Sequence, residues 1–570
     1  MVSPCGNPQI GSIDIAQVLT FVGYEIQWSN QSFCFSTDTK ECHFLMAKMM
    51  ESATAHAQIP FKNEPLTDFS KVENRQAQQE ALGLVRLEIG QTHPLLIGGQ
   101  RISSEETFAS VNPANPSEVI GYFASATLEQ VNEAVRAAEE AFKSWKRVPA
   151  EERAGYLFAA AEAMRRKRFY FNAWMIYEVG KSWVEADADT AEAIDFLEFY
   201  GREMLRLAED KPLPQIEGEE DRLVYIPLGA GAVIPPWNFP GAIMVGMTSA
   251  AVVTGNTVVL KPASTSPMIA WQFMRVLEEV GLPAGVVNFV TGSGGKIGDA
   301  LIEHPRIRFI AFTGSREVGL RIHELAAKPQ KGQIWLKRTI LEMGGKDAVV
   351  VDETADLDAA ADGIVASAFG FQGQKCSAGS RAIIVEQVYD QVLQKVVEKT
   401  KKLSVGDVTK PETYMGPVVD QNAFNKINAY IEIGKDEGHL LTGGGHHGPG
   451  YFIEPTIIAD VAPQARIAQE EIFGPVLAVI KAKDFDEAID IANSTEYGLT
   501  GSLYSRDSAR IERAKEEFHV GNLYFNRKCT GAMVGAHPFG GFNMSGTDSK
   551  TGGPDYLLLF TQAKSIAVKK

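Results

Sequence analysis

The chain has 570 residues, of which 45% are hydrophobic and 22% charged, the proportions of an ordinary globular protein with roughly two to four domains. Its 55 basic and 71 acidic side chains give a formal net charge of −16. This excess of negative charge disfavours nucleic acid and anionic membranes as main partners and supports solubility, while a local basic pocket could still bind a small anion.

The cysteines are few and irregularly spaced, which fits neither a disulfide framework nor a zinc ribbon. They are Cys5, Cys34, Cys42, Cys376 and Cys529. The first basic residues, Lys40 and Arg75, come too late for a secretory or mitochondrial leader. We therefore expect a cytoplasmic protein.

Residues 1–60 show no helical or strand period. They contain internal methionines that are alternative start sites, at Met46, Met49 and Met50. We treat this stretch as an N-terminal extension of the folded chain, either disordered or a product of the choice of start site.

The first clear element is an amphipathic helix that begins after Thr127. Thr127 and Gln130 have the pattern of a capping box. Apolar residues then recur at steps of three and four as far as Trp145. The sequence therefore predicts a helix over 128–145.

Residues 223–260 carry no charged side chain, and part of this stretch approaches the length of a membrane span. Prolines and polar residues interrupt it, so strands and a helix buried in an α/β core explain the lack of charge better. Within it, Asn238 lies between Pro236 and Pro240, which favour a rigid turn.

Farther on, short apolar runs alternate with helical patterns. Expected strands lie at 257–260, 286–290, 309–312 and 348–351, and expected helices at 268–280 and 316–327. This alternation is typical of parallel, doubly wound sheets and predicts an α/β fold. The tail at 556–568 suits an edge strand able to pair with another subunit.

Three strand ends carry signals of a bound nucleotide, none decisive alone. Residues 292–298 lack the third glycine of the dinucleotide fingerprint, where Ile297 stands, and the hydroxyl of a P-loop. Ser315 can cap a helix whose N-terminus favours phosphate, with an ordinary cap as the alternative. Lys261 closes a strand at the ligand-binding edge of the sheet, with a solvated loop charge as the alternative.

Three further residues supply the chemistry of aldehyde oxidation. Cys376 offers a nucleophile, Glu342 a base beside two glycines, and Asn238 an oxyanion donor. Each alone has a plainer interpretation as a buried thiol, a surface carboxylate or a turn residue. The joint pattern is specific, because the chain presents in order Asn238, Lys261, Ser315, Glu342, Cys376 and the segment 471–476.

That order resembles the aldehyde dehydrogenase superfamily, and four further segments resemble its bacterial 1-pyrroline-5-carboxylate dehydrogenase branch. These segments are 110–115, 185–192, 521–526 and 538–548. The resemblance implies a Rossmann-like NAD-binding domain over 61–340 and an α/β catalytic domain over 341–525. It also implies that 526–570 returns to the first domain, that a small β arm mediates oligomerisation, and that the protein is a homodimer or larger homo-oligomer.

The resemblance also implies residue roles. The catalytic residues are Cys376, Glu342 and Asn238. The NAD-binding residues are Pro236, Trp237, Lys261, Ser264, Gly294, Gly298, Phe312, Gly314, Ser315, Val318, Glu471 and Phe473. The substrate-binding residues are Phe239, Ser377, Thr530, Gly531, Ala532 and Phe539.

The implied reaction is the NAD-dependent oxidation of L-glutamate 5-semialdehyde to L-glutamate in proline and arginine catabolism, through a thiohemiacetal and a thioester on Cys376. Two alternatives stay open: another semialdehyde or aliphatic aldehyde with NAD or NADP, and a catalytically silent binding protein. Lys528 and Gly379 differ from some relatives, which leaves the choice among semialdehydes less certain. No metal is expected, because His446 and His447 have no matching acidic residues nearby.

Overall fold

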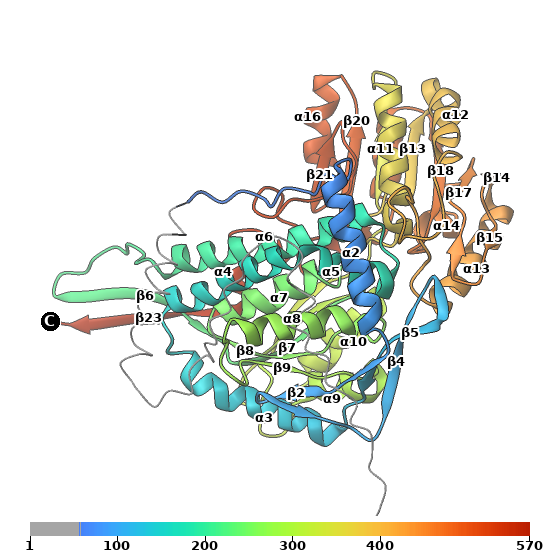
Figure 1. The fold of residues 1–570 in the computed structure, drawn as a ribbon. Coiled ribbons are helices and arrows are strands. Elements are labelled where there is room, and N and C mark those ends of the chain that lie inside the picture. The colour runs from blue at the N-terminus through green and yellow to red at the C-terminus, as the bar shows by residue number, and fades with distance from the viewer. Residues whose placement is uncertain (1–55, 57–58) are drawn as a thin grey trace, which may run out of the picture. The chain divides into compact units, whose positions relative to one another are not determined.

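A computed structural model describes His56 and residues 59–570. Apart from His56, Ile59 and Pro60, the expected N-terminal extension lies outside these residues. Two seven-stranded sheets, each covered by helices, make up most of the described chain (Figure 1).

The first sheet is built from residues 95–342. Its order is β11 (Arg338–Glu342), β10 (Phe309–Thr313), β7 (Ala230–Ile234), β8 (Thr257–Leu260), β9 (Val287–Phe289), β2 (Leu95–Ile97) and β3 (Gln100–Ile102). The five strands from β11 to β9 run parallel, and β2 and β3 close one edge in antiparallel pairs. The predicted doubly wound α/β character is therefore confirmed.

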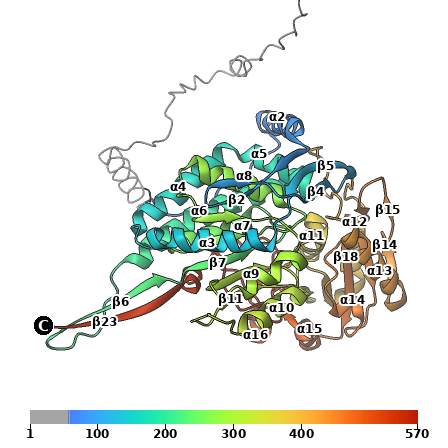
Figure 2. The same ribbon diagram turned by 90° about the horizontal axis from the view of Figure 1, so that it is seen from below.

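Helices cover both faces of this sheet (Figure 2). Before and between its strands lie α2 (Val72–Glu88), α3 (Leu128–Trp145), α4 (Ala150–Arg166), α5 (Arg168–Val179), α6 (Trp183–Ala208), α7 (Ala242–Val253), α8 (Pro267–Glu279), α9 (Asp299–Glu303) and α10 (Arg316–Ala327). Successive residues of β10 alternate between two cores: Phe309 packs with α7 and α8, and Ile310 with α3 and α10. The strands are apolar throughout because both faces are buried.

The second sheet is built from residues 348–525. Its order is β14 (His439–Thr442), β17 (Thr456–Ala459), β18 (Val476–Ala482), β13 (Arg381–Val385), β12 (Ala348–Val351), β20 (Thr500–Tyr504) and β21 (Asn522–Phe525). All neighbours run parallel except β14. Its helices are α11 (Leu357–Phe369), α12 (Tyr389–Thr400), α13 (Gln421–Glu437), α14 (Arg466–Gln469), α15 (Phe485–Asn493) and α16 (Ser508–Glu517). This sheet has its own core.

Smaller strands complete the fold. They are β1 (Gln91–His93), β4 (Thr107–Asn112), β5 (Asn115–Ala124), β15 (His446–His447), β16 (Phe452–Ile453), β19 (Tyr497–Gly498) and β22 (Phe542–Asn543). A long antiparallel ribbon, β6 (Glu219–Pro227) with β23 (Thr561–Lys569), projects from the first sheet's side (Figure 1).

The sequence placed several elements accurately. The capping box at Thr127 forms, and β8, β12 and α10 have the predicted bounds. The prediction of a strand from residue 556 is wrong for Tyr556–Phe560, which forms a 3₁₀ turn. The reason is that Arg338 Nη1 donates to the carbonyls of Leu558, Leu559 and Thr561, so these acceptors bend toward one cation.

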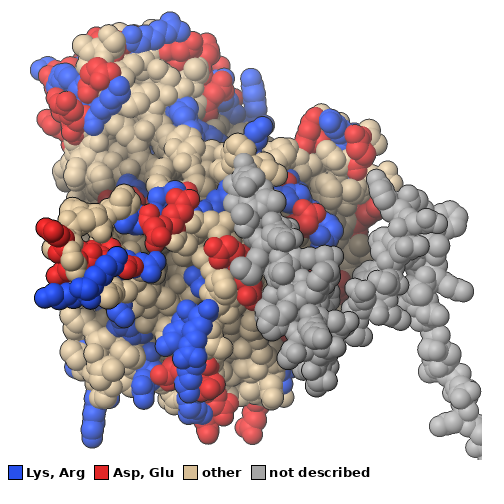
Figure 3. All heavy atoms as spheres, turned by 90° about the vertical axis from the view of Figure 1, so that its left-hand side faces the viewer, with Lys and Arg blue, Asp and Glu red and all other residues tan. Residues whose placement is uncertain are grey.

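Across the described chain, no helix is long and apolar enough to cross a membrane. Within the same residues, no group of three His, Cys, Asp or Glu side chains could hold a metal ion. On the part of the described chain that Figure 3 shows, Lys and Arg side chains are interspersed with Asp and Glu.

Candidate active site

The candidate site lies where the carboxyl ends of the first sheet meet the amino ends of the second. Asn238 follows β7, Lys261 follows β8, and Glu342 is the last residue of β11. Cys376 lies in the loop that leads into β13. Carboxyl ends of parallel strands are where open α/β sheets bind ligands. The fold therefore gathers residues that are far apart in the sequence along one boundary.

The loop that bears Cys376 touches both neighbouring segments. Asn238 Nδ2 donates to the carbonyl oxygen of Gln374 at 3.1 Å, two residues before the thiol. On the other side, the carbonyl oxygen of Cys376 packs so tightly on Gly345 that a Cβ there would overlap it. Because Gly345 is three residues beyond Glu342, the amide, thiol and carboxyl segments are in mutual contact.

Burial raises the pKa of the Cys376 thiol above its usual range, and the nearby carboxyls of Asp347, Glu342 and Glu471 raise it further. The resting thiol is therefore protonated at neutral pH. Its backbone N–H has no hydrogen-bond acceptor among residues 59–570, so it can receive a developing oxyanion together with the Asn238 amide.

Glu342 is buried, and its two carboxyl oxygens differ in their hydrogen bonding. Ser549 donates to Glu342 Oε1 through its hydroxyl, and through its backbone N–H at 3.4 Å. Glu342 Oε2 has no hydrogen-bond partner in the described part of the chain. Burial raises the pKa of Glu342 to about 8. A carboxyl that titrates near neutral pH, with one oxygen free, is well suited to take a proton from water or a thiol.

The backbone near the thiol is held in an uncommon conformation that the sequence did not signal. Phe371 and Gln372, in the short turn Gly370–Gly373, have φ of 47° and 57° although neither is glycine. Gln372 Nε2 donates to the carbonyls of Gly180 and Pro417 at 3.0 and 2.8 Å, which fixes this turn. Left-handed backbone of this kind persists only where surrounding contacts determine it, and it often marks functional sites.

Most of the predicted cofactor residues lie at the carboxyl ends of the first sheet's strands, beside a groove that has Ser315 in its lining. Lys261 is buried, its Nζ reaches only the carbonyl of Pro262 at 3.3 Å, and burial lowers its pKa to about 8. Ser264 donates to the carbonyl of Gly292 at 3.3 Å. At Gly294 and Gly298, no atom of the described chain lies within 4 Å of the place where a Cβ would be, so packing within the protein does not explain the glycines.

On the far side of this groove, Ser315 caps α10 by accepting from Val318 N at 3.3 Å, as its plainer interpretation predicted. Gly314 N donates to the carbonyl of Glu342 at 3.0 Å, and Phe312 and Pro236 are buried. Val318 is 44% exposed. Phe312, Gly314 and Ser315 thus lie in succession at the carboxyl end of β10, and Ser315 is the one of these three that lines the groove.

Glu471 and Phe473 reach the groove from the second sheet. Glu471 Oε1 accepts from Gly345 N at 3.1 Å, and the Phe473 ring meets Trp237 edge-on at 5.5 Å between centroids. A cleft of about 680 Å³ has Ser315 on one wall and Glu471 on the other. Both sheets thus contribute to one binding groove.

A buried cluster of charges beside Phe239 was not anticipated. Lys181 lies 4.1 Å from the Phe239 ring centre and pairs with Asp189 at 3.0 Å, both side chains being fully buried. Lys375, next to the thiol, pairs with Glu185 at 2.8 Å. The sequence did contain a signal for the acidic partners, in the segment 185–192, but none for Lys181.

The loop at 526–541 contains three successive backbone N–H groups that are unpaired. Among the described residues, the backbone N–H groups of Thr530, Gly531 and Ala532 have no acceptor, and Thr530 Oγ1 is buried without a partner. Gly531 has φ of +78°, a conformation that glycine adopts readily. Free N–H donors are the groups that a carboxylate would require at the predicted anchor.

The remaining predicted substrate residues border this loop. Ser377 is buried, and its carbonyl accepts from Cys529 Sγ at 3.4 Å, one residue before Thr530. Phe539 N and O pair with Thr551 O and N at 2.8 and 2.7 Å, so a short bridge fixes its backbone. Both residues therefore lie on segments that are tied to the anchor loop.

Residues 101–566 match the aldehyde dehydrogenase family. The chain belongs to this family. A 1-pyrroline-5-carboxylate dehydrogenase of Geobacillus thermodenitrificans is 62% identical over 509 residues, which cover 89% of this chain and 99% of that protein. A namesake from Geobacillus kaustophilus matches to the same extent.

Among solved structures of this family, a 1-pyrroline-5-carboxylate dehydrogenase from Thermus with bound NAD is 52% identical and superposes with a TM-score of 0.88. The match covers 90% of this chain and 99% of that one. A mutant of the Thermus thermophilus enzyme gives a TM-score of 0.89 at the same identity and coverage. The family and the fold are therefore the ones that the sequence indicated.

Proposed function

We propose that this protein oxidises L-glutamate 5-semialdehyde to L-glutamate with NAD, in proline and arginine catabolism. The observation that carries the proposal is the convergence of Cys376, Glu342 and Asn238, together with an anchor of free N–H groups at Thr530–Ala532. Relatives at 62% identity bear the name of this activity, which supports the choice of substrate.

In the proposed reaction, the carboxylate of Glu342 takes the thiol proton of Cys376 and passes it to solvent, and the thiolate attacks the aldehyde carbon to form the oxyanion of a thiohemiacetal. Asn238 Nδ2 and the Cys376 N–H hold this oxyanion; each such donor is worth roughly 3 kcal/mol. NAD, which the groove residues would hold, would supply the hydride acceptor, and departure of the hydride from the adduct would leave a thioester on Cys376. Glu342, as carboxylate, then removes a proton from water, which attacks the thioester and releases the acid.

The groove has the features that a dinucleotide requires. Lys261 presents a buried ammonium without a side-chain partner, suited to ribose hydroxyls. Gly294 and Gly298 leave space for a close backbone approach to a phosphate. Glu471 is held by Gly345 where the two sheets meet, suited to the second ribose. We therefore assign to NAD the twelve groove residues predicted above.

The substrate pocket separates two kinds of contact. The aliphatic part of the substrate lies between Phe239 and Phe539, its carboxylate on the Thr530–Ala532 anchor, and Ser377 supplies a further donor.

The residues of 61–340 form the cofactor domain, those of 341–525 the catalytic domain, and 526–570 returns to the first. The ribbon of β6 and β23 is the arm through which we propose a cytoplasmic homo-oligomer forms.

A steady-state assay tests the substrate and the cofactor together. We expect kcat/KM for glutamate semialdehyde with NAD to exceed that for succinate semialdehyde by at least about tenfold, because succinate semialdehyde has no ammonium group and its carboxylate lies one carbon closer to the aldehyde, which places it less well on the anchor. Each substrate is measured with NAD and with NADP by the absorbance of the reduced cofactor. Equal or inverted preference between the two semialdehydes would show that another aldehyde is the substrate.

The pH dependence of turnover should report Glu342. Because its pKa is raised to about 8, the acid form dominates below that pH and cannot accept a proton from water. Steady-state turnover should therefore rise with pH through about 8 and level off above it, provided that thioester hydrolysis limits the rate. Rapid-mixing experiments separate the pH dependence of steady-state turnover from that of the first NADH burst. A steady-state rate that falls with rising pH would contradict the assignment of Glu342 as the base.

A further inference from the structure

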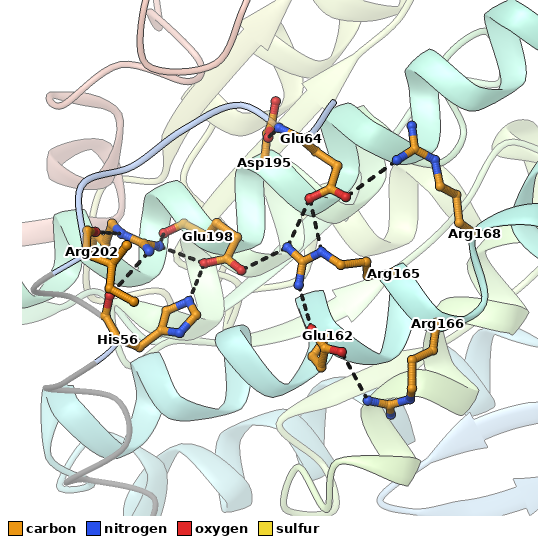
Figure 4. Close-up of polar contacts among 10 residues, drawn as sticks. His56, Glu64, Glu162, Arg165, Arg166, Arg168, Asp195, Glu198 and Arg202 are labelled. Carbon is orange, nitrogen blue, oxygen red and sulfur yellow. Dashed lines mark hydrogen bonds and ion pairs between the residues drawn. The ribbon is translucent and has the colours of Figure 1, made fainter. Parts of the chain in front are cut away.

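Residues 59–70 form an irregular segment that leads to α2, and we call this segment the strap. It runs along α6 and also contacts α4 and α5 (Figures 1 and 4). Unlike most irregular segments, it is tied down by several charged groups. Glu64, for example, accepts from Arg165 Nε at 3.0 Å and pairs with Arg168 at 3.4 Å.

Two buried carboxylates of α6 accept hydrogen bonds from the strap. Asp187 accepts from both the backbone N–H and the hydroxyl of Thr67, each at 2.7 Å. Asp195 accepts from Glu64 N at 2.6 Å and from Asn63 Nδ2 at 2.8 Å. Hydrogen bonds to ionised acceptors are stronger than neutral ones, so these two points define the path of the strap.

Asn63 also makes a hydrogen bond from the strap to the loop at 526–541. The same Nδ2 also donates to the carbonyl oxygen of Val534 at 3.0 Å, across 471 positions of sequence. A side-chain amide carries two hydrogens, so Asn63 joins Asp195 of α6 directly to the anchor loop. Beside it, Phe61 packs edge-on against Phe199, and a Cβ at Gly535 would lie 3.1 Å from both rings.

Hydrogen bonds on both sides fix the part of the loop that carries the free donors. On its N-terminal side, Arg527 Nη2 donates to the carbonyls of Thr530 and Gly531, both at 2.8 Å. On its C-terminal side, Met533 N donates to His537 Nδ1 at 3.1 Å within the loop, and Asn63 holds Val534 O from outside it. Asn63 therefore ties the C-terminal side of the anchor to α6.

We propose that Asn63 is a positioning residue for substrate specificity, which acts by holding the Thr530–Ala532 anchor where it meets the substrate carboxylate. This inference rests on the proposed function, since it assigns the anchor to that carboxylate. It makes Asn63 a support of the substrate pocket, although Asn63 does not touch the reacting atoms.

The test is Asn63→Ala in the full chain, assayed with glutamate semialdehyde and with a short aliphatic aldehyde that has no carboxylate. We expect KM for glutamate semialdehyde to rise roughly 5- to 20-fold with kcat within about twofold, since the hydrogen bond that holds Val534 O is lost together with the one to Asp195. KM for the aliphatic aldehyde should not change. The matched control is Thr67→Val, which removes a strap hydrogen bond to Asp187 but no contact to the loop, and should leave both KM values unchanged.

Amide hydrogen exchange of the peptide around 530–534, without substrate, gives a readout that does not depend on the reaction. Asn63→Ala should speed it and Thr67→Val should not. Unchanged exchange, or an equal rise of KM for both aldehydes, would overturn the inference. Failure of the proposed function would instead appear in the wild type, as no preference for glutamate semialdehyde. If Asn63→Ala does not fold, Asn63→Ser carries the same expectations, because its hydroxyl cannot reach Asp195 and Val534 together.

Discussion

Replacement of Cys376 by alanine is expected to lower aldehyde oxidation by roughly 10⁴-fold or more, because no thiohemiacetal can then form and no other group replaces the nucleophile. The variant should keep its affinity for NAD, since the groove residues do not depend on the thiol. Steady-state NADH formation measures the first point, and quenching of tryptophan fluorescence by NAD measures the second.

Cys529 supplies the matched control for this experiment. It is the other cysteine in the described chain, it is fully buried, and its thiol donates to the carbonyl of Ser377 at 3.4 Å. Cys529→Ser conserves that donor and should retain most of the activity. Turnover at a normal rate in Cys376→Ala, or loss of turnover in Cys529→Ser alone, would mean that the nucleophile has been assigned to the wrong sulfur.

Glu342→Gln is expected to separate the two halves of the reaction. Thioester formation should give a burst of about one NADH per site, followed by a steady state slower by roughly 10²- to 10⁴-fold, because glutamine cannot take a proton from water. The rise of turnover with pH near 8 should also be absent in this variant. Stopped-flow absorbance shows both phases in a single trace.

Ser549→Ala provides the comparison for this variant, because the Ser549 hydroxyl donates to Glu342 Oε1. Without that donor, the carboxylate loses part of its stabilisation, so the pKa of Glu342 should rise and the pH limb should move upward while turnover persists. A Glu342→Gln enzyme that shows no burst yet turns over as the wild type does would place the water-activating base elsewhere.

Elements that are buried on both faces could be predicted from the sequence with little error. The bounds of β8 and β12 follow from short apolar runs, because a strand with helices on both sides has no polar positions. The nomination of Asn238, Glu342 and Cys376 likewise needed only their chemistry and their order. Local pattern was sufficient for these features.

Contacts between distant segments could not be predicted in this way. Lys181 is a fully buried cation whose partner Asp189 and neighbour Phe239 come from other elements, and nothing in its local sequence distinguishes it from a surface lysine. The left-handed backbone at Phe371 is also unmarked, since it is fixed by tertiary contacts rather than by glycine. Only the fold reveals such residues.

The short stretch from Glu342 to Asp347 is the direct covalent link between the last strand of one sheet and the first strand of the next. It also touches the loop of Cys376 and the carboxylate of Glu471. Because the same short stretch joins the sheets and carries the base, a change in its length would displace Glu342 relative to Cys376 as well as one sheet relative to the other.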